Sequence, residues 1–224
     1  MSRASNGAFD PTVGHALEAH GFDRDYRTGQ RIDSGIEPES KVRYTDVRLD
    51  PERRTVLLTR PLVIDLGAVA KGMAIDLAAR ELRPLENFTI NAGGDVYVGG
   101  RNPEGQPWRV GIRHPREPGA IIETLCVSDL AVCTSGDYER PSGESRSEHH
   151  IVDPRTGHSP AAIASLTVVA PTAMVADALG TAAFVLGPVD GLSLLDREGV
   201  EGSIVTPSLE RRSTRGYARY RECR

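Results

Sequence analysis

The chain of 224 residues is 39% hydrophobic and 26% charged, and its formal net charge is -4. This length and composition allow one large domain or two small ones with a real hydrophobic core. The weak negative charge argues against a nucleic-acid groove and against an anionic membrane surface, so an anionic substrate would need local charges, backbone amides or a metal ion.

The first part of the chain predicts two helices separated by a loop and short strands. The elements expected before residue 67 are a helix over 12–20, a loop over 24–41, and strands over 42–49, 55–59 and 62–66. Val69, Met73 and Leu77 then follow the helical spacing i, i+4, i+8, beside a stripe of alanines. This second helix is closed by Pro84.

The rest of the chain predicts mostly strands. They are expected over 87–90, 95–98, 108–113, 121–127, 130–134, 165–170, 202–205 and 217–220, with 121–127 and 130–134 forming a hairpin. A helix is expected over 172–186, with Thr172 as N-cap and Gly187-Pro188 as its stop, and a short one over 191–197. Because strands dominate and helices do not alternate with them, the pattern favours an α+β fold with antiparallel sheets.

The cysteines and the first residues bear on the cellular compartment. Cys126, Cys133 and Cys223 form no CxxC pair, so a zinc site is not expected; the first two predict reduced core thiols, and the third a mobile end. The first ten residues lack the apolar core of a signal peptide, and no window approaches a membrane span of about 20 residues. As written, the sequence predicts a cytoplasmic protein without a membrane span.

The helix over 172–186 is apolar on nearly all sides but carries Asp177 and Thr181 four positions apart, hence on one face. A carboxylate inside an apolar helix is costly unless it is paired or binds a metal, and a carboxylate with a hydroxyl suits Mg²⁺. The spacing alone slightly favours a structural role, such as an ion pair for Asp177 and a backbone hydrogen bond for Thr181.

The segment over 63–76 predicts a strand, a turn at Gly67 and a helix that carries Lys71. Asp65 would end the strand, and Lys71 with the helix N-terminus could face a pyrophosphate. Gly72 would allow a backbone or a ligand to come close. A plain strand-turn-helix joint explains the same residues, and the sequence does not decide between the two.

Three loop motifs offer polar groups, at 91–95 (NAGGD), 134–137 (TSGD) and 149–157 (HHIVDPRTG). Turn chemistry favours these same residue types, so each motif is weak alone. Of the two adjacent histidines, His149 is expected to be the bystander. The basic run over 211–215 predicts a solvated loop.

Seven motifs follow one another in a fixed order. They are GAFDPTVG (7–14), DLGAVAKGMAID (65–76), NAGGD (91–95), WRVGIRHP (108–115), CTSGDYER (133–140), HIVDPRTG (150–157) and VVAPTAMVADALGTAAFVLG (168–187). Together they resemble the ApbE-type FAD:protein FMN transferases over nearly the whole chain. The resemblance implies a single ApbE-like, T-fold-related domain over residues 1–224.

The resemblance also implies a binding site for FAD and Mg²⁺ and a reaction at that site. The resemblance implies FAD in a cleft, with Mg²⁺ at the pyrophosphate held by the carbonyl of Ala68 and the side chains of Asp177 and Thr181. The matching flavin-nucleotide contacts are Ala8, Phe9, Asp10, Asp65, Lys71 and Val152. The FMN half would pass to a Ser or Thr hydroxyl of an acceptor protein, with release of AMP, and His150 would be the base.

The physical chemistry of this reaction agrees with those roles. A metal ion would neutralise charge on the pyrophosphate, and a general base is worth roughly 10²–10⁴-fold. Because some members hydrolyse FAD to FMN and AMP, an FAD pyrophosphatase is the alternative, as is a non-catalytic FAD-binding protein. Neither the acceptor protein nor the oligomeric state follows from the sequence.

The resemblance has two departures. Family members carry a long segment before GAFDPT, whereas here this motif begins at Gly7, so the expectation is either a true start that lies upstream or a shortened member with a more open flavin site. An extracytoplasmic location is the expectation if the true start lies upstream. The second departure is His15, where the family usually has proline.

Overall fold

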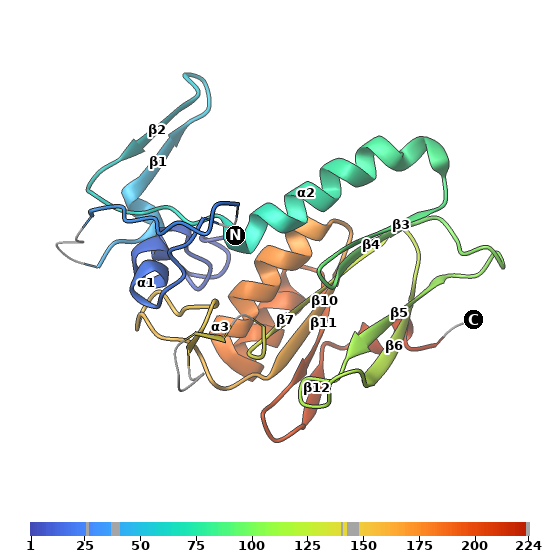
Figure 1. The fold of residues 1–224 in the computed structure, drawn as a ribbon. Helices are drawn as coiled ribbons and strands as arrows, with labels where there is room; N and C mark the ends of the chain where they lie inside the picture. The colour runs from blue at the N-terminus through green and yellow to red at the C-terminus, as the bar shows by residue number, and fades with distance from the viewer. Residues whose placement is uncertain (26, 37–40, 140, 143–147, 223–224) are drawn as a thin grey trace.

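The computed structural model describes residues 1–25, 27–36, 41–139, 141–142 and 148–222 (Figure 1). Its helices are α1 (Gly14–Ala19), α2 (Gly67–Leu82) and α3 (Ala173–Arg197), with 3-10 turns at Pro11–Val13, Tyr44–Asp46, Arg83–Leu85 and Tyr217–Tyr220. Its strands are β1 (Val47–Asp50), β2 (Thr55–Leu58), β3 (Phe88–Ala92), β4 (Asp95–Gly99), β5 (Trp108–Arg113), β6 (Ile121–Val127), β7 (Leu130–Gly136), β8 (Pro141–Ser142), β9 (Glu148–His149), β10 (Ser165–Ala170), β11 (Glu201–Val205) and β12 (Arg211–Ser213). Two positions that the sequence singled out, Arg140 and Cys223, lie outside the described residues.

A six-stranded sheet with the order β12-β11-β10-β7-β4-β3 forms the centre of the fold. The hairpins β1–β2, β5–β6 and β8–β9 are separate two-stranded sheets, and every pairing among the described strands is antiparallel. Strands with α2 and α3 packed against them make an α+β fold, as the sequence predicts.

Two hydrophobic clusters flank the central sheet. Leu166 and Val168 of β10 belong to the cluster under α3, whereas Val169 belongs to the cluster on the opposite side, under β5–β6. Because successive strand residues point to opposite faces, β10 is buried on both, and every residue of it is buried. The result is three layers: helices, sheet, and the β5–β6 hairpin (Figure 1).

The α3 helix is long and apolar enough to cross a membrane by length and composition. However, 61% of its most apolar window is buried inside the protein, where it packs on β7 and β10 as a core helix does. Thr172 caps it by accepting a hydrogen bond from the Val175 amide at 3.3 Å, as predicted. At Gly187, φ is 82°, so the chain breaks there into the two helices that the Gly-Pro signal predicts.

Several sequence predictions are wrong because they depend on which strands pair. Residues 62–66 form no strand: they run beside the first 3-10 turn, where the Asp65 amide donates to the Pro11 carbonyl at 2.8 Å. The predicted hairpin of β6 with β7 does not form, since β6 pairs with β5 and β7 lies between β4 and β10.

The C-terminal part also differs from the prediction. Residues 217–220 form a 3-10 turn instead of a strand, because Tyr217 is fully buried and its hydroxyl donates to Glu123 at 3.0 Å. Part of the basic run, expected as a loop, is the exposed edge strand β12, and its Arg211 pairs with Glu123.

Cys126 was expected to be a reduced thiol and is disulfide-bonded, whereas Cys133 is a buried free thiol, as predicted. Pairing needs two cysteines within about 7 Å between Cα atoms, and sequence position does not report that distance.

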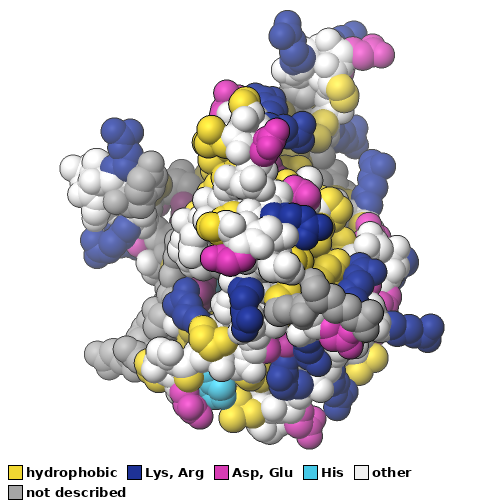
Figure 2. Space-filling model, turned by 90° about the vertical axis from the view of Figure 1, so that its right-hand side faces the viewer, with side chains coloured by type: hydrophobic (Ala, Val, Ile, Leu, Met, Phe, Trp, Pro, Cys, Tyr) yellow, Lys and Arg dark blue, Asp and Glu magenta, His cyan; other side chains and the backbone are white. Residues whose placement is uncertain are grey.

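The surface mixes charged and apolar side chains. On the face in Figure 2, Lys, Arg, Asp and Glu side chains are interspersed, and hydrophobic side chains show between them. Exposed large apolar residues cluster on the β1–β2 hairpin and on the outer side of α2; they are Leu49, Val56, Leu57, Leu58, Met73 and Leu77.

Candidate functional site

One cavity of about 710 Å³ collects residues from distant parts of the chain. It lies between the N-terminal segment, the first turns of α2, the loop after β9 and α3. All the residues that the sequence singled out as a site line it: Ala8, Phe9, Asp10, Asp65, Ala68, Lys71, His150, Val152, Asp177 and Thr181. Its volume is in the range of small-molecule and cofactor sites, about 300–1,000 Å³.

The crossing of α2 over α3 fixes the position of Asp177. A Cβ atom on Gly72 would lie 2.5 Å from the Ala173 carbonyl oxygen, so only glycine lets the two helices approach this closely. The carboxylate of Asp76 accepts hydrogen bonds from the Ala173 amide at 2.7 Å and from the Met174 amide at 3.0 Å. Gly72 and Asp76 of α2 therefore fix the position of the first turn of α3, which lies one turn before Asp177.

Two carboxylates and one ammonium group meet at the floor of the cavity. Lys71 Nζ lies 2.7 Å from Asp95 Oδ2, and Asp95 Oδ1 accepts the Thr134 amide at 3.0 Å. Burial lowers the pKa of Lys71, but the charge and hydrogen bond of Asp95 outweigh it, so the pKa stands above its usual value. Lys71 is therefore positively charged, and its ammonium group is held in place by the ion pair with Asp95.

Among the described residues, Asp177 forms no ion pair like the one that joins Lys71 to Asp95. Burial raises the pKa of its carboxyl to about 7, and the charge of Asp95 adds to the shift, against the opposing effects of Lys71 and the Gly72 amide. The Gly72 N–H donates to Asp177 Oδ2 at 3.1 Å, although its partner in a regular helix is the carbonyl of Ala68. Asp177 thus competes with Ala68 for that amide, and a cation here would restore its negative charge.

Thr181 follows Asp177 by one turn of α3 and is half-buried at the cavity wall. With Asp177 and the carbonyl of Ala68 it makes an all-oxygen donor set, which suits a hard cation such as Mg²⁺. The buried carboxylate with a raised pKa is the observation that fits a metal, since an uncompensated charge there is costly.

His150 reaches the cavity from the loop after β9. Its Nδ1 lies 2.9 Å from the Glu139 carbonyl oxygen, and because a carbonyl only accepts, Nδ1 carries the proton. In the neutral ring the lone pair is then on Nε2, as a general base requires.

His149 behaves differently from its neighbour. It is 4% exposed, contacts Phe184 edge to face, and directs Nε2 to the Pro160 carbonyl at 3.2 Å. Burial lowers its pKa. It is a core histidine and is not among the residues that line the cavity.

The N-terminal motif builds one wall of the cavity. Asp10 accepts the Thr12 amide at 2.9 Å and the Thr12 hydroxyl at 2.7 Å on Oδ1, and the Tyr44 amide at 2.9 Å on Oδ2. Its carboxylate is thus occupied with holding this segment, which positions Ala8 and Phe9 against the cavity. Asp65 similarly accepts the Gly67 amide at 2.7 Å, at the entry to α2.

The loop motifs divide between turns and cavity wall. In NAGGD, Gly93 and Gly94 have φ of 66° and 106° and form the two-residue turn of the β3–β4 hairpin, which places Asp95 at the start of β4. In TSGD, the Thr134 hydroxyl shares a 3.0 Å hydrogen bond with Thr167, and Asp137 accepts hydrogen bonds from two guanidinium nitrogens of Arg116 at 2.7 Å.

The sequence did not single out some residues that line the cavity. Arg24 and Phe22 come from the stretch after α1, and Arg113 ends β5. Arg113 lies in the motif WRVGIRHP, for which no role was predicted, and no motif marked Phe22 or Arg24. They add two positive charges and an aromatic ring to the wall.

Comparisons with known proteins agree with this geometry. The sequence model of the ApbE family matches residues 1–204. The chain is 36% identical to the FAD:protein FMN transferase of Rhodobacter capsulatus over 93% of its own length and 42% of that protein, and 30% identical to that of Haemophilus influenzae over 89% and 61%. It therefore spans less than two thirds of the length of these two relatives.

Solved structures show the same fold. The ApbE protein from Thermotoga maritima superposes with a TM-score of 0.86 at 33% identity, over 99% of this chain and 74% of that one. The flavin transferase ApbE from Vibrio cholerae superposes with a TM-score of 0.80 at 26% identity, over 98% and 72%. The chain belongs to the ApbE family.

Proposed function

We propose that this ApbE-family chain transfers the FMN half of FAD to a Ser or Thr hydroxyl of an acceptor protein and releases AMP. The observation that carries the proposal is the convergence of residues from all seven motifs on one cavity of about 710 Å³. The relatives that match most of this chain are named FAD:protein FMN transferases, which supports the same reaction.

In this proposal Asp177, Thr181 and the carbonyl of Ala68 hold Mg²⁺ beside the pyrophosphate. When bound, the ion supplies positive charge that offsets the negative charge developing on the phosphate oxygens. Lys71, held by Asp95 at 2.7 Å, adds a second positive charge on the same side of the cavity.

The chain's own residues then move one proton. The acceptor hydroxyl oxygen forms a bond to the phosphorus of the FMN half, the bond from that phosphorus to the bridging oxygen breaks, and AMP leaves with the bridging oxygen. The hydroxyl proton passes to Nε2 of His150, whose ring is oriented by the Nδ1 hydrogen bond to Glu139.

The test incubates the protein with FAD, Mg²⁺ and an acceptor domain that bears a flavinylation sequence. We expect covalent flavin fluorescence on the denatured acceptor and AMP release only when the acceptor is present. Equal AMP release without acceptor would replace the proposal by an FAD pyrophosphatase. Tight FAD binding without AMP release would replace it by a non-catalytic FAD-binding role.

Two variants assign the roles. His150→Ala should lower transfer by roughly 10²–10⁴-fold with little change in FAD affinity. Asp177→Ala should abolish the Mg²⁺-dependent activity; unchanged binding of Mg²⁺ with FAD in calorimetry would refute the ligand assignment. Asp190→Asn, an exposed carboxylate on the same helix, is the matched control.

We also propose that the protein works in an oxidising compartment outside the cytoplasm. The disulfide at Cys126 supports this, because disulfides persist in oxidising compartments and are rare in the cytosol. In protein from native cells, Cys126 should react with an alkylating reagent only after reduction. Immediate alkylation of Cys126 in the unfolded, unreduced protein would instead favour a cytoplasmic location.

A further inference from the structure

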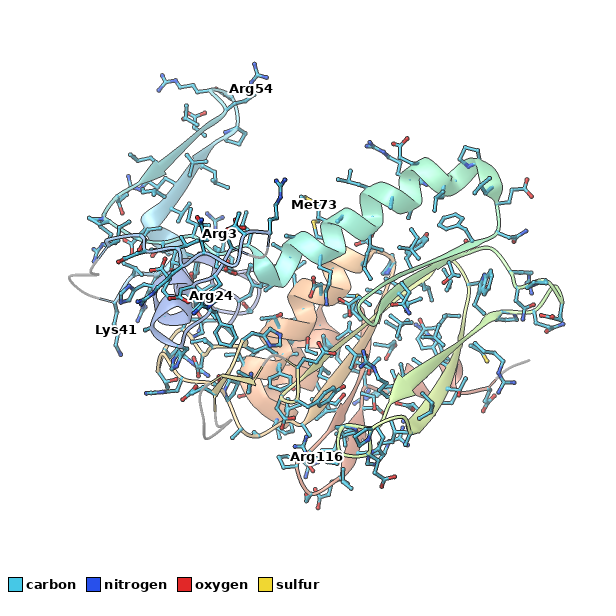
Figure 3. All side chains as sticks on the ribbon, viewed as in Figure 1. Arg3, Arg24, Lys41, Arg54, Met73 and Arg116 are labelled. Carbon is cyan, nitrogen blue, oxygen red and sulfur yellow. The ribbon has the colours of Figure 1, made fainter. Side chains whose placement is uncertain are left out.

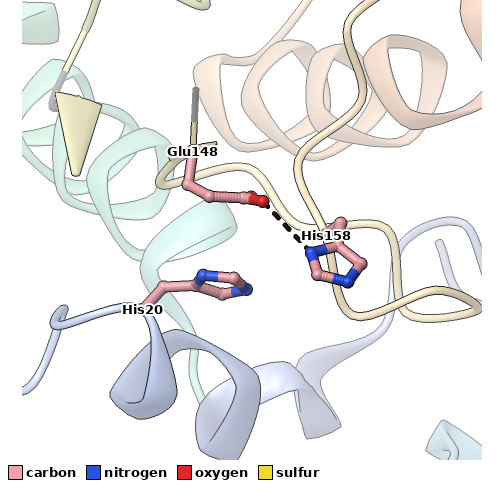
Figure 4. A group of neighbouring side chains, drawn as sticks. All are labelled: His20, Glu148 and His158. Atoms are coloured by element: carbon pink, nitrogen blue, oxygen red, sulfur yellow. Dashed lines mark hydrogen bonds and ion pairs between the residues drawn. The ribbon is translucent and has the colours of Figure 1, made fainter. Parts of the chain in front are cut away.

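Two imidazoles and a carboxylate converge at the rim of the molecule, outside the residues that line the cavity (Figure 4). His20 follows α1, Glu148 lies in β9, and His158 follows the Asp-Pro turn of the next loop. One ligand atom from each lies within 4.8 Å of the other two, and His158 Nδ1 is 3.1 Å from Glu148 Oε1. The function described above uses none of these three side chains.

The donor set is that of a transition metal. Two imidazoles with one carboxylate are a common protein ligand set for Zn²⁺, which leaves a fourth position for water. With metal–ligand bonds of about 2.0–2.2 Å, tetrahedral ligand atoms lie about 3.4 Å apart, so a side-chain movement of about 1 Å would close this cluster. A nitrogen-rich set also separates this cluster from the all-oxygen set around Asp177, which suits Mg²⁺.

The surroundings hold the three side chains in place. Glu148 accepts the Ser159 amide at 2.8 Å on Oε2, which leaves Oε1 directed at His158. Ser159 also donates its hydroxyl to the His149 carbonyl at 2.7 Å and accepts the His149 amide at 2.8 Å. Hydrogen bonds of this kind orient the ligands of metal sites before the ion binds.

His20 is held by the same loop. Its Nε2 lies 2.6 Å from the Gly157 carbonyl oxygen, and Gly157 donates its amide to the Asp153 carbonyl at 2.8 Å. If His20 binds the ion through Nδ1, its Nε2 keeps the hydrogen bond to the Gly157 carbonyl. If it binds through Nε2, the metal bond replaces that hydrogen bond.

We propose that His20, Glu148 and His158 bind a transition-metal ion of the Zn²⁺ class, at a site separate from that of the proposed magnesium ion. The ion connects the end of α1 to the loop over 148–158. Leu17 and Phe22 on one side, and His150 and Val152 on the other, line the flavin cavity. Metal binding therefore holds the end of α1 against the loop over 148–158, and both segments contribute to the cavity wall.

The test uses the whole chain without a histidine tag, freed of metal with a chelator. We expect one equivalent of Zn²⁺ to bind in calorimetry, with or without saturating Mg²⁺, and Co²⁺ to give the visible absorption of a tetrahedral site. Zinc at 100 times its Kd should raise the Tm by about 5 °C or more. No stoichiometric binding to the wild-type chain would show that the cluster is only a hydrogen-bonded carboxylate–imidazole pair and overturn the proposal.

Two variants in the cluster and two controls outside it locate the ion. His158→Asn and Glu148→Gln should each weaken Zn²⁺ binding at least tenfold, and the glutamine keeps an acceptor for the Ser159 amide, so that the loop stays folded. His114→Asn, the same change outside the cluster, and Asp177→Asn should leave Zn²⁺ affinity unchanged. Undiminished zinc binding in both His158→Asn and Glu148→Gln, or its loss in Asp177→Asn, would overturn the assignment.

Discussion

The two long helices, α2 and α3, are both apolar, but they are buried to different extents. Asp177 is one of only a few polar side chains on α3, whose residues are buried along most of its length, whereas Met73 and Leu77 on α2 are 49% and 47% exposed. Figure 3 shows Met73 on the side of α2 away from α3. The buried positions of α2 are Gly72, Ile75 and Ala79.

The reason is the close crossing of the two helices. Gly72 lets α2 approach the first turn of α3, and the apolar side chains of Met73 and Leu77 are left on the outside. Hydrophobic periodicity therefore identifies a helix but does not say which of two apolar faces is buried. Asp177, the proposed metal ligand, lies on the enclosed helix, where burial raises the pKa of its carboxyl.

The largest expected effect concerns the carboxyl of Asp177 in the metal-free protein. Its pKa is raised from 3.8 to about 7 in the folded state, so the folded state binds the proton more tightly than the unfolded state. The stability from this group is fully present below about pH 4 and is lost as the pH rises through about 7, on the order of 4 kcal/mol in total. In chelator, Tm should fall between about pH 4 and pH 7 for this reason.

Asp177→Asn should remove that part of the slope and be the more stable protein at pH 8. Asp190→Asn, exposed on the same helix, should keep the slope of the wild type. Parallel Tm curves for the wild type and Asp177→Asn would mean that the carboxyl of Asp177 is not desolvated. The difference in burial between α2 and α3 would then not extend to this residue.

Some elements of the fold could be predicted from the sequence, and others could not. Local signals predicted β5, β10, the cap Thr172 and the break at Gly187, because each depends on a few neighbouring residues. Strand partners were missed, as for β6 and β7, since pairing is set by layers that form across the whole chain. The disulfide at Cys126 was missed for the same reason.

The candidate site follows the same division. Spacing alone slightly favoured a structural role for Asp177, and only the order of seven motifs predicted that it belongs to a metal site. What no motif could give is the raised pKa of Asp177 or the cluster around His158, because both arise from segments that meet only in the folded chain.

The next largest effect is expected at the helix crossing. In an exposed helix, Gly→Ala stabilises by about 1 kcal/mol, but a Cβ on Gly72 would meet the backbone of α3 at 2.5 Å. Gly72→Ala should therefore destabilise the protein by about 3 kcal/mol in urea unfolding. The reverse exchange at exposed Ala74, to glycine, should cost only about 1 kcal/mol. A stabilising Gly72→Ala would show that the helices can move apart.

A smaller effect is expected from the residue that holds the start of α3. Asp76→Ala removes a carboxylate that accepts two amides of α3 and should cost about 1–2 kcal/mol. Asp76→Asn keeps one acceptor oxygen and should cost less than alanine. Equal losses in the two variants, measured by urea unfolding, would indicate that charge at the helix N-terminus matters more than the hydrogen bonds.

The smallest effect is expected on the outer face of α2, where Met73→Gln should change the free energy of unfolding by less than about 0.5 kcal/mol. Ile75→Ala, two residues later on the buried face at 2% exposure, should cost about 2–5 kcal/mol. The pair uses one helix, so differences in helix propensity stay small beside the difference in burial. If Met73→Gln proved as costly as Ile75→Ala, the outer face would be covered in solution, and α2 would be an enclosed helix like α3.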